Sequence, residues 1–431
     1  YVIGRAPIWL TLFAMLGLVA VMAAYAAAVG YGFARWLRRG SAFDRLLVLP
    51  AAWVTMEWFR GWFLSGFPWF AAGYSQIDTP LAGLAPVGGI YTVSFAVLCS
   101  AGALTALLLG GTRERILAAA VAGALWLVAF GFWDRPWTEA TGEPVTVAIV
   151  QGAVPQDLKW SIAQRDATIE LYRSLTEPHL GTDIIVWPEA ALPALVHELG
   201  HVLGPQWVDA RNSGSALVLG QLREDGEQGN YYNGVLALDR EAQWYYKRRL
   251  VPLSEYFPVP DFVREWLRGL DLPYSGFEPG ARRQPALDAA GQKLGVTICY
   301  EDAYAADQLA VLHEATLLVN VTNDAWFGDS TAAHQHLEIS RMRALEAGRP
   351  LLRAANDGIS AIIGADGRVV EVLPRFEPGV LTGSVQPRIG LTPYARVGNW
   401  PIVSLCLILL GVALLPRLAA LRARRAREAA V

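Results

Sequence analysis

Hydrophobic positions follow two different patterns along this chain. Near both ends, apolar residues continue for about the 20 positions that a helix needs to cross a bilayer. Five such runs are predicted, at residues 8–30, 46–64, 81–109, 116–133 and 400–415. One run alone would also fit a buried core helix, but five runs with Trp at several ends indicate a membrane region.

The middle of the chain has shorter apolar runs of another kind. Short β-branched segments predict strands at 145–150, 182–187, 216–220, 232–238, 293–299 and 315–321, and helical patterns fall at 162–175, 189–203 and 332–347. Buried strands that alternate with helices are typical of an α/β domain. The predicted division is therefore a helical membrane region at 1–133, an α/β domain at 134–390, and a last membrane helix with a basic tail at 391–431.

Composition and charge narrow the class of protein. Hydrophobic residues make up 53% of the 431 positions, which is more than a soluble globular protein usually carries. The net charge of −3 provides no basic surface for nucleic acid. Arg residues instead cluster in the short loops after the first and third runs and after the last run, and such clusters mark cytoplasmic sides.

This charge pattern also predicts an orientation. Threading the chain through alternate crossings places residues 134–399 on the outer face of the membrane, and it places Tyr1 there too. The sequence begins without Met and without the pattern of a signal peptide. We therefore expect an odd number of further spans before Tyr1.

Three short motifs in the α/β region carry candidate chemistry. They are Trp187-Pro188-Glu189, Tyr246-Lys247 and Cys299-Tyr300-Glu301. A Cys nucleophile needs a base, which a carboxylate supplies, and a cation can stabilise the oxyanion of an acyl-transfer intermediate. Because active sites in such sheets gather at the carboxyl ends of strands, Glu189, Lys247 and Cys299 are expected to meet at one sheet edge.

The Cys and His residues show whether a thiol nucleophile or a metal site is expected. Of three Cys residues, Cys99 and Cys406 lie in apolar runs, which leaves Cys299 as the one thiol of the α/β region. An isolated Cys is commonly a small buried hydrophobe, but the motifs above favour a nucleophile. His334 and His336 form a His-x-His pair without a suitably spaced carboxylate or Cys, which predicts a polar helix face and no metal. No cofactor is expected.

Several further segments strengthen the motifs. They are Glu57-Trp-Phe-Arg-Gly61, Gly66-Phe-Pro-Trp69, Gly73-Tyr-Ser-Gln-Ile-Asp78, Leu158-Lys-Trp160, Leu250-Val-Pro252, Asn323-Asp-Ala-Trp-Phe-Gly328 and Arg341-Met-Arg-Ala-Leu-Glu346. With the Glu, Lys and Cys motifs, this set resembles the membrane-embedded apolipoprotein N-acyltransferase branch of the nitrilase, or carbon–nitrogen hydrolase, superfamily. The resemblance covers nearly the whole chain and implies an αββα sandwich for the α/β domain.

The resemblance implies a ping-pong reaction at a bacterial inner membrane, with the α/β domain facing the periplasm. Cys299 would take a fatty acyl chain from a phospholipid, phosphatidylethanolamine in the family, and pass it to the terminal amine of a diacylglyceryl apolipoprotein. Glu189 would act as base, and Lys247 with the backbone N–H of Tyr300 would hold the oxyanion. The protein would act as a monomer.

Secondary roles also come from the resemblance. Glu255 and Glu301 would orient Lys247, while ordinary loop acids are the alternative. Trp160, Trp187 and Tyr300 would line an acyl pocket, against the general expectation that such aromatics belong to the core. Asn233 would help to bind substrate.

Two other functions and one segment stay open. A membrane-anchored amidase or nitrile hydrolase would use the same triad with water as acyl acceptor. A transporter or binding protein with an inactive domain is disfavoured by the intact triad and by few intramembrane charges. Residues 262–270 are amphipathic and are equally compatible with an arm that enters the membrane interface and with a packed surface helix.

Overall fold

The computed structural model describes residues 8–225, 230–252, 254–256 and 277–429. The amphipathic segment at 262–270 lies outside these residues. The chain divides into two compact units, one made of residues 1–135 and 396–431 and the other of residues 136–395.

The first unit is helical. Its α-helices are α1 (Ile8–Gly32), α2 (Leu49–Arg60), α3 (Ala85–Leu109), α4 (Thr112–Phe132) and α12 (Trp400–Glu428). Shorter turns of other helix types are η1 (Phe33–Leu37), η2 (Asp44–Val48), η3 (Ala72–Gln76) and η4 (Pro80–Leu84). Helix α2 packs against α1, α3 and α12, and α3 packs against α4.

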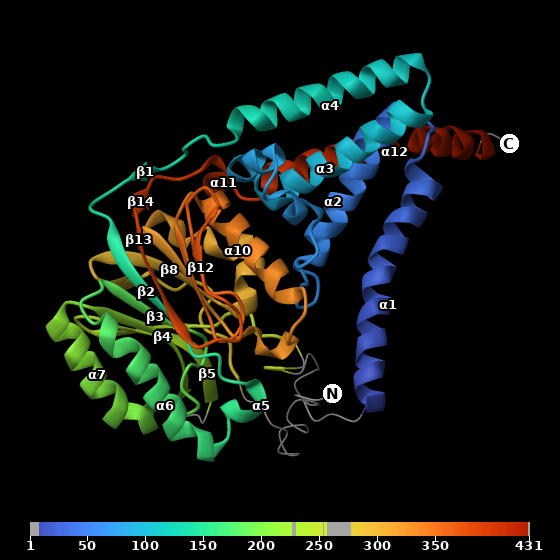
Figure 1. Ribbon diagram of the computed structural model, residues 1–431. Coiled ribbons are helices and arrows are strands. Elements are labelled where there is room, and N and C mark those ends of the chain that lie inside the picture. The colour runs from blue at the N-terminus through green and yellow to red at the C-terminus, as the bar shows by residue number, and fades with distance from the viewer. Residues whose placement is uncertain (1–7, 226–229, 253, 257–276, 430–431) are drawn as a thin grey trace. The chain divides into compact units, whose positions relative to one another are not determined.

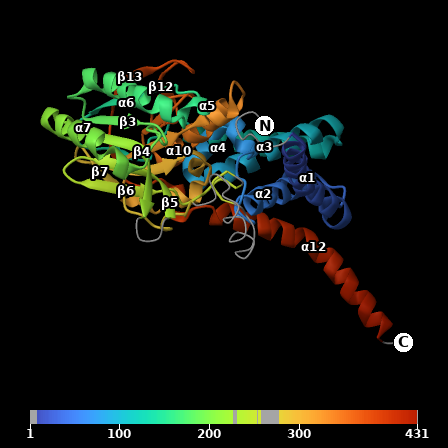
Figure 2. The ribbon, with the colours of Figure 1, turned by 90° about the horizontal axis from the view of Figure 1, so that it is seen from below.

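Four helical stretches among the described residues are long and apolar enough to cross a membrane. They are Thr11–Leu37, Pro80–Leu109, Thr112–Phe132 and Trp400–Glu428. Large apolar side chains such as Phe13, Leu127 and Ile408 are exposed on them, as expected of helices that face lipid. Figure 2 shows α12 as one continuous helix that ends near the C-terminus.

The predicted run at 46–64 is the exception. Here η2 runs directly into α2, and the helical stretch ends at Arg60. Glu57 and Arg60 on this helix are both buried inside the unit. This stretch is not among the four long apolar helices, and a membrane span at 46–64 stays a prediction.

The second unit contains two six-stranded sheets. One sheet has the order β13-β2-β3-β4-β5-β6, and the other has the order β12-β11-β10-β9-β8-β7. The first comprises β2 (Val145–Gln151), β3 (Ile184–Trp187), β4 (Ala216–Asp225), β5 (Asn230–Leu238), β6 (Ala242–Tyr246) and β13 (Gly379–Val385). The second comprises β7 (Leu287–Ala289), β8 (Gln292–Ile298), β9 (Leu317–Thr322), β10 (Leu351–Ala355), β11 (Ala361–Ile363) and β12 (Val369–Val372).

Helices complete the unit. They are α5 (Gln156–Lys159), α6 (Ile162–Thr176), α7 (Gly200–Ser213), α9 (Ala305–Gln308), α10 (Ala332–Ala347) and α11 (Pro393–Val397). The single turns that matter below are η7 (Cys299–Ala303) and η9 (Asp324–Phe327). A small two-stranded sheet pairs β1 (Glu139–Ala140) with β14 (Arg388–Ile389).

Three apolar clusters define the layers of this unit. The largest joins side chains of both sheets, including Val147, Ile149 and Val319, and so lies between them. A second covers the outer face of β2, β3 and β4 beneath α6 and α7, which lie side by side in Figure 1. A third packs α10 and α11 on the outer face of the other sheet. The arrangement confirms the predicted αββα sandwich.

The predicted elements at 145–150, 293–299 and 332–347 correspond closely to β2, β8 and α10. The predicted helix at 189–203 is wrong in its first seven residues, 189–195, which are followed by the 3-10 helix η6 (Val196–Leu199). Ala190 has a positive φ of 45° directly after β3, and Pro193 follows, so the α-helix begins only at Gly200. This irregular segment places Glu189.

Candidate active site

Glu189 is held by its backbone. It lies two residues beyond the end of β3 and is 7% exposed. The buried Lys159 donates from its ammonium to the Glu189 carbonyl oxygen at 3.1 Å. A Cβ on Gly220 of β4 would lie 2.5 Å from the Glu189 Cα, so only glycine allows this close approach. Burial lowers the pKa of Lys159 to about 8, against the opposing charges of Glu189 and Asp357.

Lys247 joins two carboxylates. Its ammonium lies 3.0 Å from Glu189 Oε1 and 2.8 Å from Glu255 Oε1, and the lysine is 2% exposed. Burial lowers the pKa of Lys247, but the charges of Glu189 and Glu255 outweigh it and raise that pKa well above its ordinary value. Lys247 is therefore a permanent cation at this site.

Asn233 completes the carboxylate cluster. Its side-chain amide donates to Glu189 Oε1 at 2.7 Å and to Glu255 Oε1 at 3.1 Å. Its backbone carbonyl accepts from the Lys247 N–H at 2.8 Å. Within the described part of the chain, the buried side-chain oxygen of Asn233 has no hydrogen-bond donor. The other Glu255 oxygen accepts from the Val251 N–H at 2.8 Å.

Cys299 follows the last residue of β8 and begins η7. Its φ of 51° is in the left-handed region, which is costly for a residue with a Cβ. Burial and the Glu189 charge raise the pKa of the Cys299 thiol well above its ordinary value, while Lys247 and a hydrogen bond with Thr322 lower it. The resting group is thus a neutral thiol beside a carboxylate and an ammonium.

The three residues do not come from one sheet edge. Glu189 and Lys247 follow β3 and β6 of one sheet, whereas Cys299 follows β8 of the other. The predicted convergence is wrong in this respect, because the strand order places the motifs on two packed sheets. The segments that carry Lys247 and Cys299 are joined through Glu301, which accepts hydrogen bonds from the Arg248 N–H and from the Ile298 N–H.

Glu301 ties the Lys and Cys segments together. Glu301 Oε2 accepts from the Ile298 N–H and the Tyr245 hydroxyl, each at 2.9 Å, and Oε1 accepts from the N–H groups of Arg248 and Arg249 at 2.6 and 3.1 Å. Burial raises the pKa of Glu301. Glu301 thus acts on the backbone after Lys247, while Glu255 contacts the Lys247 ammonium directly.

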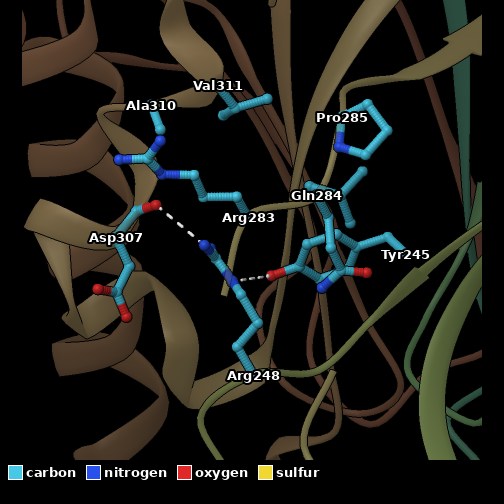
Figure 3. Close-up of a pocket in the computed structure, with 9 residues that line it drawn as sticks. Tyr245, Arg248, Arg283, Gln284, Pro285, Asp307, Ala310 and Val311 are labelled. Atoms are coloured by element: carbon cyan, nitrogen blue, oxygen red, sulfur yellow. Dashed lines mark hydrogen bonds between the residues drawn. The ribbon is translucent and has the colours of Figure 1, made fainter. Parts of the chain in front are cut away.

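A small pocket lies beside this support. Figure 3 shows Arg248 in it, donating to the Tyr245 hydroxyl at 2.9 Å and to the Asp307 carbonyl at 3.1 Å. Glu189, Lys247 and Cys299 do not line this pocket. It therefore belongs to the structural support of the loop and not to the reacting groups.

The three predicted aromatic contacts have different surroundings. Trp160 is 38% exposed directly after α5 and is accessible to a substrate. Trp187 is 1% exposed, packs on Tyr172 and donates to the Thr176 hydroxyl at 3.0 Å, so its side chain serves the core and not an acyl pocket. Tyr300 is 9% exposed and its ring packs edge-on against Tyr304.

Sequence reasoning missed a second buried ionic cluster, beneath Cys299. His336 contacts Asp324 at 2.8 Å and Asp302 at 3.0 Å, and Arg353 contacts Asp324 at 2.8 Å. All four side chains are at most 1% exposed. The expected polar helix face therefore holds for the exposed His334 but is wrong for His336. Among the described residues, no group of His, Cys, Asp and Glu is arranged to hold a metal.

Comparisons with known proteins cover both units. Residues 146–394 match the family model described as carbon–nitrogen hydrolase, and residues 1–103 match that of the apolipoprotein N-acyltransferase N-terminal domain. The apolipoprotein N-acyltransferase of Methylococcus capsulatus is 42% identical over 406 residues, which cover 93% of this chain and 80% of that protein. Its counterpart in Azotobacter vinelandii is 41% identical over 434 residues, 98% of this chain and 83% of that protein.

Solved structures give weaker similarities. A carbon–nitrogen hydrolase superfamily protein from Xanthomonas campestris aligns with a TM-score of 0.41 and 18% identity, covering 57% of this chain and 91% of its own. An amidase from Nesterenkonia sp. aligns with a TM-score of 0.43 and 19% identity, covering 61% and 97%.

Proposed function

Because the chain belongs to the apolipoprotein N-acyltransferase family, we propose that it transfers a fatty acyl chain from a phospholipid to the terminal amine of a diacylglyceryl-cysteine on an apolipoprotein. The observation that carries the proposal is the buried cluster of Glu189, Lys247 and Glu255, whose Lys247 segment is tied through Glu301 to the Cys299 segment. The apolar helices of the first unit would keep this chemistry beside its lipid donor.

The first half-reaction forms a thioester. The Cys299 sulfur attacks the sn-1 ester carbonyl of the phospholipid, and Glu189 accepts the thiol proton. The ester C–O bond then breaks, and Glu189 returns the proton to the leaving lysophospholipid oxygen. A thiol that is neutral at rest favours this transfer during attack, and the adjacent carboxylate is the base that it requires.

The second half-reaction forms the amide. The amine attacks the thioester carbonyl, its proton passes to Glu189, and the C–S bond breaks to restore the Cys299 thiol. A thioester is reactive enough to acylate an amine, so a ping-pong order follows. In both steps Lys247 and the Tyr300 N–H would stabilise the oxyanion.

The neighbouring residues have supporting roles in this proposal. Glu255 orients Lys247 through its 2.8 Å contact, and Glu301 fixes the backbone that carries Lys247. The side-chain oxygen of Asn233 is placed to accept a hydrogen bond from substrate, since its amide is already turned toward the two carboxylates. Trp160 provides an accessible aromatic surface for lipid.

We further propose a bacterial inner-membrane location with several spans and a monomeric enzyme. The second unit would face the periplasm, because Arg clusters flank the apolar helices on the opposite side. Phosphatidylethanolamine would serve as donor.

The product assay tests the transferase against the hydrolase. Purified protein is incubated with phosphatidylethanolamine vesicles and a diacylglyceryl-cysteine peptide, and both N-acyl peptide and free fatty acid are quantified by mass spectrometry. We expect the acyl chain mostly on the peptide, and none with Cys299→Ala. Free fatty acid formed at the same rate with and without peptide would instead support a hydrolase, and no product of either kind would support an inactive binding protein.

A further inference from the structure

The backbone carbonyl of Cys299 is held from beneath by two buried side chains. His336 Nε2 lies 3.2 Å from this oxygen, and the Asn320 amide donates to it at 3.3 Å. His336 belongs to α10 and Asn320 to β9, so the contacts come from two different elements of the sandwich.

These two donors are themselves fixed by charge. Asp324 and Asp302 flank the His336 ring at 2.8 and 3.0 Å, and Arg353 donates to the Asn320 side-chain oxygen at 2.7 Å and to Asp324 at 2.8 Å. Ser340 also donates to Asp302 and accepts from Arg353. Two carboxylates thus face one guanidinium and one imidazole, and burial makes any unpaired charge costly.

The charge on His336 follows from these neighbours. Burial and the Arg353 charge lower its pKa, but Asp302 and Asp324 outweigh them and raise it to about 9. The ring is therefore an imidazolium near neutral pH, with both nitrogens acting as donors. This state allows Nε2 to donate toward the Cys299 carbonyl and Asp302 together.

The orientation of the Cys299 carbonyl also determines the direction of the Tyr300 N–H in the same peptide. The Cys299–Tyr300 peptide is trans, so its N–H points opposite to its C=O. Donors that hold the Cys299 oxygen toward the interior therefore turn the Tyr300 N–H away from the interior. The positive φ at Cys299 costs energy, and a fixed carbonyl offsets the tendency of this peptide to rotate.

We propose that His336 and Asn320 are positioning residues that set the Cys299–Tyr300 peptide, and through it the Tyr300 N–H that stabilises the oxyanion. This inference rests on the proposed function, because it assigns a task to residues beneath the same nucleophile. It predicts a defect in acyl transfer that is separate from any defect in thiol reactivity.

Two reagents separate these effects in the whole 431-residue chain in detergent. An activated ester, p-nitrophenyl butyrate, acylates Cys299 through a tetrahedral oxyanion, whereas iodoacetamide alkylates the same thiol without one. Both rates are measured at Cys299 by peptide mass spectrometry in the parent, Asn320→Ala and His336→Gln. Any change in thiol pKa affects both rates, so the ratio of acylation to alkylation reports the oxyanion site.

We expect this ratio to fall at least about tenfold in both variants, since loss of one oxyanion donor costs on the order of a hundredfold or more. His334→Gln is the matched control, because His334 is exposed on the same helix, and it should keep the parental ratio. A parental ratio in both Asn320→Ala and His336→Gln would overturn the inference. A parent that is alkylated but never acylated at Cys299 would contradict the proposed function and the inference together.

Discussion

The second unit contains two buried ionic clusters near the Cys299 segment, and they differ in charge balance. In the Lys247 cluster, the carboxylates of Glu189 and Glu255 pair with the single ammonium of Lys247. In the His336 cluster, the carboxylates of Asp302 and Asp324 pair with the Arg353 guanidinium and the His336 imidazolium. The Lys247 cluster has one more carboxylate than cations, and this carboxylate can accept a proton. The His336 cluster has two carboxylates and two cations, so its charges balance. Under the proposed function, the first cluster would perform the chemistry and the second would fix the geometry.

The largest effect is expected from removing the surplus charge. Glu189→Gln keeps the shape of the side chain and an acceptor for Lys247 but cannot take up the thiol proton. We expect acyl transfer to fall about a thousandfold, within the range of general base catalysis. Initial rates of peptide acylation measure this. Glu314→Gln, at an exposed position, is the control. A loss of less than tenfold in Glu189→Gln would remove the distinction between the clusters.

The backbone position of Glu189 can be tested without changing any charge. In Gly220→Ala, the new Cβ would lie 2.5 Å from both the Glu189 Cα and the Pro188 carbonyl oxygen, so the carboxylate must move. We expect activity to fall about a hundredfold, because small misplacement of a reacting group is costly. Gly204→Ala has open space around the new Cβ and should retain full activity. Equal activities would show that the placement of Glu189 is not critical.

The His336 cluster should stabilise the folded protein, and this stabilisation should depend on pH. The folded pKa of His336, about 9, is above its ordinary value of 6.5, so its contribution is complete below pH 6.5 and is lost as pH rises through 9. Asp302, Asp324 and Arg353 are the charged groups that face it. The loss should be on the order of 3 kcal/mol.

Thermal denaturation in detergent at pH 6 and pH 9.5 measures this contribution. The midpoint of the parent should fall more between these two pH values than that of His336→Gln, because the variant lacks the titrating group. His334→Gln should follow the parent. Parallel curves for the parent and His336→Gln would show that His336 is not held as an imidazolium.

The smallest effect is expected outside both clusters, at Trp160. Its ring is 38% exposed, and we expect Trp160→Ala to raise the apparent KM for phospholipid about fivefold with little change in kcat, the scale of a partly buried aromatic contact. Trp160→Phe should recover most of the affinity. Lipid titrations at fixed peptide concentration measure both constants. A fall in kcat at unchanged KM would contradict a role in lipid binding.

The sequence predicted the strands and helices of the sandwich better than the place where the candidate site residues come together. Short β-branched runs identified β3 and β8, and the motifs after them identified Glu189 and Cys299 as candidate groups. Their arrangement across two sheets depends on strand order, which local patterns do not contain. The helix expected at 189–203 failed for a local reason, since Ala190 takes a positive φ where the chain passes Gly220.

The His336 cluster could not be predicted from the sequence for a different reason. In the sequence His336 stands beside the exposed His334, but its partners Asp324 and Asp302 lie 12 and 34 positions away. No spacing rule joins residues from η9, η7 and α10. A buried charge network of this kind becomes visible only when the fold brings its members together.

The central claim is that Cys299 carries the acyl chain, and trapping the intermediate tests it most directly. The protein is incubated with phosphatidylethanolamine vesicles without any acceptor peptide, and its intact mass is measured. The account predicts a fatty-acyl increment on the parent that hydroxylamine removes, that diacylglyceryl-cysteine peptide discharges, and that Cys299→Ala lacks. An increment that persists in Cys299→Ala, or a parent that forms N-acyl peptide by direct transfer without ever carrying the acyl chain, would contradict it.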